Sequence, residues 1–151
     1  MKANILIIDD EESIRFSFHR FLAAVGYNVV TAGSYFEALS KMDEMEFDLI
    51  LADIILDDGW GTDILQEVIQ RNLKTRVIIM TAYPTEKTVN ASFSMHAIDY
   101  LIKPLRQGGL LFFVSKALRQ MESGEDEGFD PAGKAYPVAG NEYEHINFTK
   151  N

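Results

Sequence analysis

The sequence predicts an α/β fold in which five strands and five helices alternate around a parallel sheet. Short runs rich in Ile, Val and Leu recur along the chain, and longer segments with the 3.6-residue period of amphipathic helices lie between them. Strict alternation favours right-handed crossovers, which place helices on both faces of the sheet and give a three-layer sandwich. With 151 residues, the chain has room for one such domain.

Five segments have the apolar, β-branched composition of strands. The runs ILII, LILA and VIIM are apolar throughout, as expected for central strands that are buried on both faces, whereas NVVT suits an edge. The predicted strands cover residues 4–8, 28–31, 48–52, 76–80 and 99–102.

The segments between these strands have the pattern of helices. Gly26 is expected to end the first helix, and Ser34 with Glu37 three residues later forms a capping-box pattern that opens the second. The fourth helix is less periodic and is expected at residues 85–95, anchored by Val89 and Phe93. The apolar faces of the other four are Ile14, Phe18, Phe21, Leu22 and Val25; Tyr35, Ala38, Leu39 and Met42; Ile64, Leu65, Val68 and Ile69; and Leu110, Leu111, Val114, Leu118 and Met121.

Composition excludes several classes of function. A net charge of -9 disfavours binding to nucleic acids or anionic membranes, because no basic surface is available to meet their phosphates. No apolar run approaches the roughly 18 to 20 residues that span a bilayer, and the N-terminus does not resemble a cleavable signal. The chain has no cysteine, which excludes disulfides and thiolate sites and agrees with a reducing compartment. We expect a cytoplasmic domain with protein or cation partners and no membrane association.

The periodic pattern stops near residue 123. Residues 124–151 are acidic, contain Gly and Pro, and have no period, so we expect a domain at 1–123 followed by a tail or linker at 124–151. Mobile polypeptide is one interpretation of this tail. Docking on the domain or on a partner is the other, through the aromatic side chains of Phe129, Tyr136, Tyr143 and Phe148.

Polar residues follow four of the predicted strands. Asp9 and Asp10 come after the first strand, Asp53 after the third, Thr81 after the fourth and Lys103 after the fifth. In an open α/β sheet, ligands bind beyond the carboxyl ends of the strands where the winding reverses. If the strand order is 2-1-3-4-5, the flavodoxin-like (βα)5 arrangement, these groups converge on one crevice.

Three carboxylates in one crevice repel one another unless a cation neutralises them. Asp9 and Asp10 by themselves also fit a solvated loop, but Asp53 and Lys103 in the same crevice favour a cation site. Mg²⁺ prefers oxygen ligands, and no Cys or strand-end His is present to favour zinc or copper. The expected cofactor is therefore Mg²⁺.

A lysine, a hydroxyl group and Mg²⁺ around a carboxylate form a site for phosphoryl transfer. Asp53 ends the buried run LILAD, which would aim it into the crevice as the nucleophile. Neither GxxxxGK[ST] nor GxGxxG is present, so the phosphoryl donor is expected to come from outside.

These residues resemble the receiver domains of response regulators in two-component signalling. The matching stretches are IDDE at residues 8–11, LADI around Asp53, Gly61, MTA at 80–82 and DYLIKP at 99–104, and together they span residues 4–121. The resemblance implies a signalling switch rather than an enzyme with a separate substrate. Such a switch assists its own phosphorylation and dephosphorylation.

The resemblance also implies roles at the site. Asp53 would accept a phosphoryl group from a histidine kinase or a histidine phosphotransfer protein. Asp9, Asp10, Asp53 and the backbone carbonyl of Ile55 would hold Mg²⁺, and Lys103 would pair with the acyl phosphate.

In such receivers, two further residues would transmit the effect of phosphorylation to the surface. Thr81 would move to hydrogen-bond the phosphate, and Tyr100 would follow from an exposed to a buried position. This couples the site to the face made by the fourth helix, fifth strand and fifth helix, through which receivers dimerise or bind targets. Lys103 and Pro104 would be joined by a cis peptide bond.

The sequence departs from many receivers at two places. Asp57, followed by Asp58 and Gly59, stands where a proline is common, so we expect a more flexible and more acidic loop with altered metal affinity. The family resemblance assigns the tuning of dephosphorylation to the positions of Ile55 and Tyr83. Both are bulky and unable to align a water, so we expect a long-lived phosphoryl group.

Two other interpretations remain open. A Mg²⁺-dependent phosphatase or phosphotransferase could use Asp53 as nucleophile, but such enzymes usually have a second acid where Ile55 stands and an inserted cap domain. A degenerate receiver that only binds partners is disfavoured by the complete set of acids, hydroxyl and lysine. The sequence does not identify the kinase or the output, nor whether the receiver is freestanding or part of a longer regulator.

Overall fold

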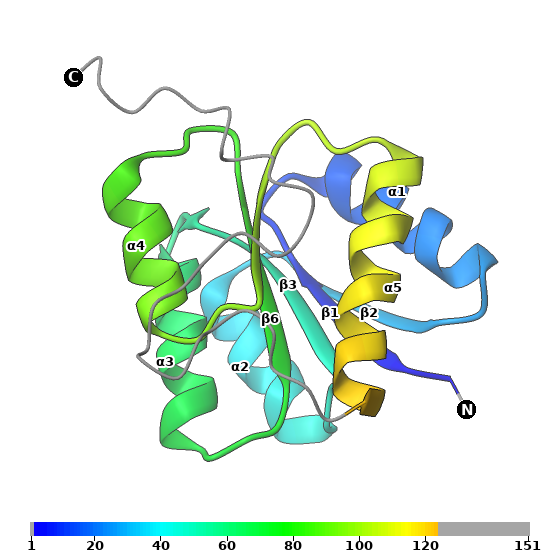
Figure 1. Ribbon diagram of the computed structural model, residues 1–151, viewed down its shortest axis with the longest axis horizontal. Helices are drawn as coiled ribbons and strands as arrows, with labels where there is room; N and C mark the ends of the chain where they lie inside the picture. Colours follow the sequence, from blue (N-terminus) through cyan, green and yellow to red (C-terminus); the bar gives the residue numbers. More distant parts are fainter. Residues whose placement is uncertain (1, 124–151) are drawn as a thin grey trace.

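A five-stranded parallel sheet forms the centre of the molecule, as Figure 1 shows in outline. The computed structural model describes residues 2–123, so the predicted tail at 124–151 lies outside the described residues. The strands are β1 (Asn4–Ile8), β2 (Asn28–Ala32), β3 (Leu49–Asp53), β6 (Arg76–Thr81) and β7 (Asp99–Ile102). They lie in the order β2-β1-β3-β6-β7. Counted along the chain, these five strands have the order 2-1-3-4-5, which confirms the predicted flavodoxin-like sandwich.

Helices cover both faces of this sheet (Figure 1). Helices α1 (Glu12–Ala24) and α5 (Gln107–Ser123) lie on one face, and α2 (Tyr35–Glu44), α3 (Gly61–Gln70) and α4 (Glu86–Ser94) lie on the other. Each face has its own apolar core, because alternate residues of the central strands point to opposite sides. β1 and β3 are therefore apolar at nearly every position, whereas β2, at one edge, is only partly buried.

Three strand boundaries differ from the prediction by one residue. β2 extends to Ala32, β3 is shifted to end at Asp53, and β6 extends to Thr81. Asp53 is paired in register with Met80, and Thr81 with Ile102. The ladder therefore holds the backbone of both Asp53 and Thr81, which were expected just beyond their strands.

The helix predictions need three corrections. Val25 was expected on the buried face of α1 but is 55% exposed, because the helix ends at Ala24 and Gly26 follows with a φ of 104°. Ile69 is 48% exposed because it lines an open groove at the end of α3. Ser34 caps α2 by accepting a hydrogen bond from the N–H of Glu37, but the Glu37 carboxylate bonds to Gly33 and not back to Ser34.

A small hairpin that the sequence did not predict lies between β3 and α3. Its strands β4 (Ile55–Leu56) and β5 (Gly59–Trp60) are antiparallel, with Ile55 opposite Trp60. A flexible loop was expected here because Asp57 replaces a proline. The two-residue connection instead lets the chain fold back on itself, since hairpins of this length are common.

Candidate functional site

The strand-end residues predicted from the sequence meet at one edge of the sheet. Asp9 and Asp10 follow β1, Asp53 ends β3, Thr81 ends β6 and Lys103 follows β7. The N–H of Asp9 donates to the carbonyl of Ala32 at 3.1 Å, which carries the pairing with β2 one residue past β1. Asp9 and Asp53 are buried, while Asp10 is half-buried.

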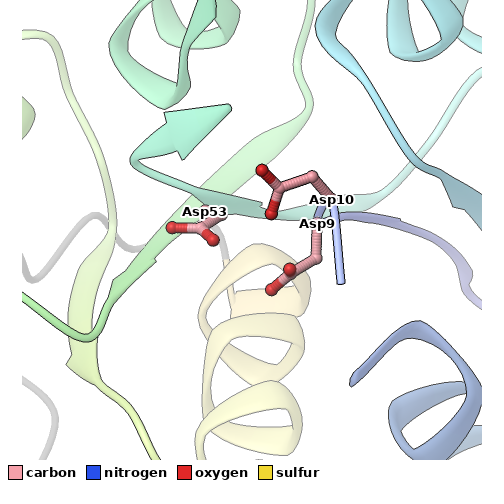
Figure 2. Close-up of side chains that lie close together, drawn as sticks. All are labelled: Asp9, Asp10 and Asp53. Atoms are coloured by element: carbon pink, nitrogen blue, oxygen red, sulfur yellow. The ribbon is translucent and has the colours of Figure 1, made fainter. Parts of the chain in front are cut away.

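Asp9, Asp10 and Asp53 form an acidic cluster beyond β1 and β3, shown in Figure 2. One carboxylate oxygen from each lies within 4.8 Å of the other two. Two oxygens bound to the same Mg²⁺ at about 2.1 Å lie at most about 4.2 Å apart, so small side-chain movements bring all three into range. The hard oxygen donors and the excess negative charge both fit this ion.

Lys103 is the cation that faces this cluster. Its Nζ lies 2.7 Å from Oδ2 of Asp9 and 2.8 Å from Oδ2 of Asp53, and Oε1 of Glu11 lies 3.8 Å away. The Lys103 side chain is only 8% exposed, its backbone N–H donates to the carbonyl of Thr81, and its peptide bond to Pro104 is cis. A single ammonium group leaves the cluster with net negative charge.

The surroundings of Asp53 and Lys103 change their pKa values. Burial raises the pKa of Asp53 above its usual value, and the repulsion from Asp9 adds to this, while the hydrogen bond from Lys103 works against both. Burial by itself would lower the pKa of Lys103, but its bonds to Asp53 and Asp9 outweigh this and raise it. Lys103 therefore stays charged at neutral pH.

Backbone groups and Arg15 orient the acids. The N–H of Ile55 donates to Oδ1 of Asp53 at 3.3 Å, and the N–H of Glu11 donates to Oδ1 of Asp9 at 2.9 Å. Nη1 of Arg15 donates to the backbone carbonyl of Asp9 at 2.6 Å. The guanidinium group packs against Gly33, where an added Cβ would come within 3.0 Å of it. Arg15 was missed because an arginine on a helix gives no sequence signal of a contact with a strand end.

Thr81 and Tyr100 lie on the α4 side of the site. Oγ1 of Thr81 accepts a hydrogen bond from the N–H of Tyr83 at 3.0 Å. Tyr100 is fully buried, and its hydroxyl lies 2.8 Å from Oγ1 of Thr88 in α4. Thr88 also lies 2.9 Å from the hydroxyl of Thr85, and its role was not foreseen. Tyr100 thus occupies the buried position in this structure while Thr81 is bonded to its own loop.

Two predicted positions are at the surface near the site. Tyr83 is 74% exposed, and Ile55 is 44% exposed. Neither carries an acid or an amide, so neither side chain adds a charge to the crevice. Within residues 2–123, no helix is both long enough and apolar enough to cross a membrane.

Comparison with known proteins identifies the family of this chain. Residues 5–114 match the model of the response regulator receiver domain. The transcriptional regulatory protein ZraR of Escherichia coli K12 is 37% identical over 120 residues, which are 80% of this chain and 27% of ZraR. The response regulator protein PilR of Pseudomonas aeruginosa is 36% identical over 114 residues, which are 76% of this chain and 26% of PilR. The chain thus spans about a quarter of the length of these relatives.

Solved structures give the same result. A CheY-like response regulator receiver domain protein from Methanospirillum hungatei superposes with a TM-score of 0.79 at 30% identity, covering 82% of this chain and 99% of that one. The beryllofluoride-activated NtrC4 receiver domain dimer superposes with a TM-score of 0.73 at 28% identity, covering 78% and 97%. The chain belongs to the response regulator receiver domain family, the signalling domain of two-component regulators.

Proposed function

We propose that this domain is the phosphoacceptor of a two-component phosphorelay, with Asp53 as the acceptor. The observation that carries the proposal is the arrangement around Asp53: Lys103 is paired with both Asp53 and Asp9, and Asp10 completes a cluster of three acids. A phosphohistidine of a histidine kinase or a phosphotransfer protein is the donor. An oxygen of Asp53 attacks phosphorus, the P–N bond breaks, and the released imidazole nitrogen takes up a proton.

The protein groups prepare Asp53 for this attack. Lys103 holds the carboxylate in its ionised form and stays beside the oxygens that gain charge during transfer. The N–H of Ile55 fixes the orientation of the carboxylate through Oδ1. Asp9 and Asp10, with Asp53 and the carbonyl of Ile55, would hold Mg²⁺, which when bound neutralises charge on the phosphoryl oxygens.

The response to phosphorylation is carried by Thr81 and Tyr100. Thr81 exchanges its hydrogen bond with Tyr83 for one with the new phosphate, and the loop that leads to α4 follows. Tyr100, hydrogen-bonded to Thr88 of α4, links this loop to the face made by α4, β7 and α5. That face then forms a homodimer or binds a target or output domain.

Trp60 offers a test of this proposal, because it is more than half exposed and pairs with Ile55 beside the cluster. Its fluorescence is recorded while Mg²⁺ and then beryllofluoride or acetyl phosphate are added. We expect saturable changes with both additions in the wild type and no phosphodonor response in Asp53→Asn. An equal phosphodonor response in Asp53→Asn would rule out Asp53 as acceptor.

The lifetime of the phosphoryl group is a second consequence. Since Ile55 and Tyr83 cannot align a water for attack, the phosphorylated form should persist for many minutes. The decay of the phosphorylated species by intact-mass measurement checks this. Loss within seconds would show that these two side chains do not slow hydrolysis.

The domain is expected to act within a larger regulatory system. Because the transcriptional regulatory protein ZraR and the response regulator protein PilR are about four times longer than the match, we propose that residues 1–123 form the receiver and 124–151 a linker or tail. The receiver itself is not expected to bind nucleic acid or membranes, and it works in the cytoplasm with its kinase.

A further inference from the structure

The hairpin between β3 and α3 is attached to α2 by the side chain of Asp58. Asp58 lies in the two-residue connection of the hairpin, and its two carboxylate oxygens accept hydrogen bonds from consecutive backbone N–H groups of α2. Oδ1 accepts from Tyr35 at 2.7 Å, and Oδ2 accepts from Phe36 at 3.1 Å. These are N–H groups of the first turn, which have no partner within the helix itself. Asp58 therefore supplies two bonds to α2 from 22 and 23 residues away.

Gly59 brings the hairpin and α2 into direct contact. A Cβ at this position would lie 3.0 Å from both Cβ and Cγ of Tyr35, so a larger residue would require Tyr35 to shift by a few tenths of an ångström. The Tyr35 side chain is itself packed against the core cluster under α2, α3 and α4. The hairpin thus rests on a side chain that the core holds in place.

The other end of the hairpin lies against the end of β3 and the residue that follows it. The N–H of Gly61 donates to the carbonyl of Ile54 at 2.9 Å, and a Cβ on Gly61 would come within 2.5 Å of the carbonyl oxygen of Asp53. Between the two attachments lies Ile55, whose N–H donates to Oδ1 of Asp53. The position of Ile55 relative to the acidic cluster depends on both ends of the hairpin.

We propose that Asp58 is a positioning residue for the cation and phosphoryl site, which it serves by tying the Ile55-bearing hairpin to the N-terminus of α2. The inference rests on the proposed function, because it assigns Asp58 a role at that site. It also explains why the hairpin needs no proline at position 57. A proline would restrict the backbone conformation there, and the Asp58 bonds and the Gly59 contact restrict it instead. α2, which contributes no side chain to the acidic cluster, thereby becomes part of the support of the site.

The test compares Mg²⁺ dissociation constants of the whole chain and its variants, measured by calorimetry and by Trp60 fluorescence. Loss of a group that orients a metal site typically weakens binding by about ten- to a hundredfold, so we expect Asp58→Ala to raise the constant about tenfold. Asp58→Asn keeps one carbonyl acceptor and should give a smaller increase. Melting temperatures of all variants are recorded in parallel.

Two control variants separate this positioning role from a general effect of charge and from a general effect on the stability of α2. Asp57→Ala removes the same charge from the neighbouring exposed position, and Ser34→Ala removes the side-chain cap that α2 has of its own. Ser34→Ala should lower the melting temperature about as much as Asp58→Ala and change the Mg²⁺ constant less than twofold, and Asp57→Ala should raise that constant clearly less than Asp58→Ala does. Equal constants for Asp58→Ala and Asp57→Ala, or for Asp58→Ala and Ser34→Ala, would overturn the proposal.

The result also separates this inference from the proposed function. A wild-type chain that binds Mg²⁺ and is phosphorylated, with an unchanged Asp58→Ala, overturns the inference and leaves the proposed function standing. A wild-type chain with no saturable Mg²⁺ response overturns both.

Discussion

The two flanks of Asp53 are held in different ways. On the α2 flank, the β4–β5 hairpin is fixed by its own pairing, by the Gly61 N–H bond to Ile54 and by Asp58. On the α4 flank, the contacts run through hydroxyl groups, from Thr81 to the Tyr83 N–H and from Tyr100 to Thr88. A hydroxyl rotates and changes partners at a cost of about 1 kcal/mol, whereas the strand pairing and the Gly61–Ile54 bond on the α2 flank join backbone atoms and change only if the chain itself moves. The comparison indicates a fixed side and a side that can switch.

Gly61→Ala should have the largest effect on stability, because it places a new side chain against backbone atoms of the fixed flank. The new Cβ would lie 2.5 Å from the Asp53 carbonyl oxygen and 3.0 Å from Cα of Ile54, and both are backbone atoms that cannot turn aside. We expect a loss of about 2–3 kcal/mol in the free energy of unfolding, measured by urea denaturation. Gly108→Ala in α5 is the control, since within residues 2–123 a Cβ there would meet no atom within 4 Å apart from its chain neighbours and its own helix backbone, and it should be neutral or stabilising. A Gly61→Ala chain as stable as the control would show that this flank is not rigid.

Asp53→Asn tests the charge between the flanks. Burial raises the pKa of Asp53 in the folded chain above its usual 3.8, so folding favours the protonated carboxyl group. The stability that this group contributes is fully present below pH 3.8. It is lost as the pH rises through the folded-state value. Without divalent cations, Asp53→Asn should therefore melt a few degrees above the wild type at neutral pH, with little difference below pH 3.8. Scanning calorimetry in chelator checks this, and a gap that widens towards acid would contradict the assignment.

The rate of phosphorylation should depend on the same ionisation of Asp53. Only the ionised carboxylate attacks phosphorus, so phosphorylation by acetyl phosphate should fall as the pH is lowered through the pKa of Asp53. Because this pKa is raised, the fall should begin above the pH expected for an ordinary aspartate. Rates measured at two Mg²⁺ concentrations test it, since more bound cation should move the fall to lower pH.

The Tyr100–Thr88 pair measures how firmly the α4 flank is held. Tyr100→Phe and Thr88→Val each remove one hydroxyl of the 2.8 Å contact and keep most of the side-chain volume. A double-mutant cycle on the free energy of unfolding should give a coupling of about 0.5–1.5 kcal/mol. A coupling near zero would mean that this hydroxyl contact does not retain Tyr100 in its buried position.

Thr81→Val should have the smallest effect on stability. The side chain is buried, but the lost bond frees only the N–H of Tyr83, a residue open to water, so the change should stay below about 1 kcal/mol. The variant should still bind beryllofluoride, yet lose the change in amide hydrogen exchange at α4. An unchanged α4 response would place the switch elsewhere on this flank.

The sequence by itself determined the alternating fold and the acidic, hydroxyl and lysine groups at the strand ends. Both depend on local patterns, the period of apolar residues and the residue that follows each strand. In a parallel sheet, all carboxyl ends lie at one edge, so positions as distant as Asp9, Asp53 and Lys103 were predicted to meet.

Tertiary structure decided how these groups are supported. Three contacts join residues that no periodic sequence pattern relates to one another. They are those of Asp58 with α2, of Arg15 with the Asp9 carbonyl and of Thr88 with Tyr100. Two of them end on backbone atoms, which every residue possesses, so no sequence pattern marks the partner. The sequence therefore identifies the groups that we propose to react, while the packing of hairpin, helix and strand decides how each of them is held.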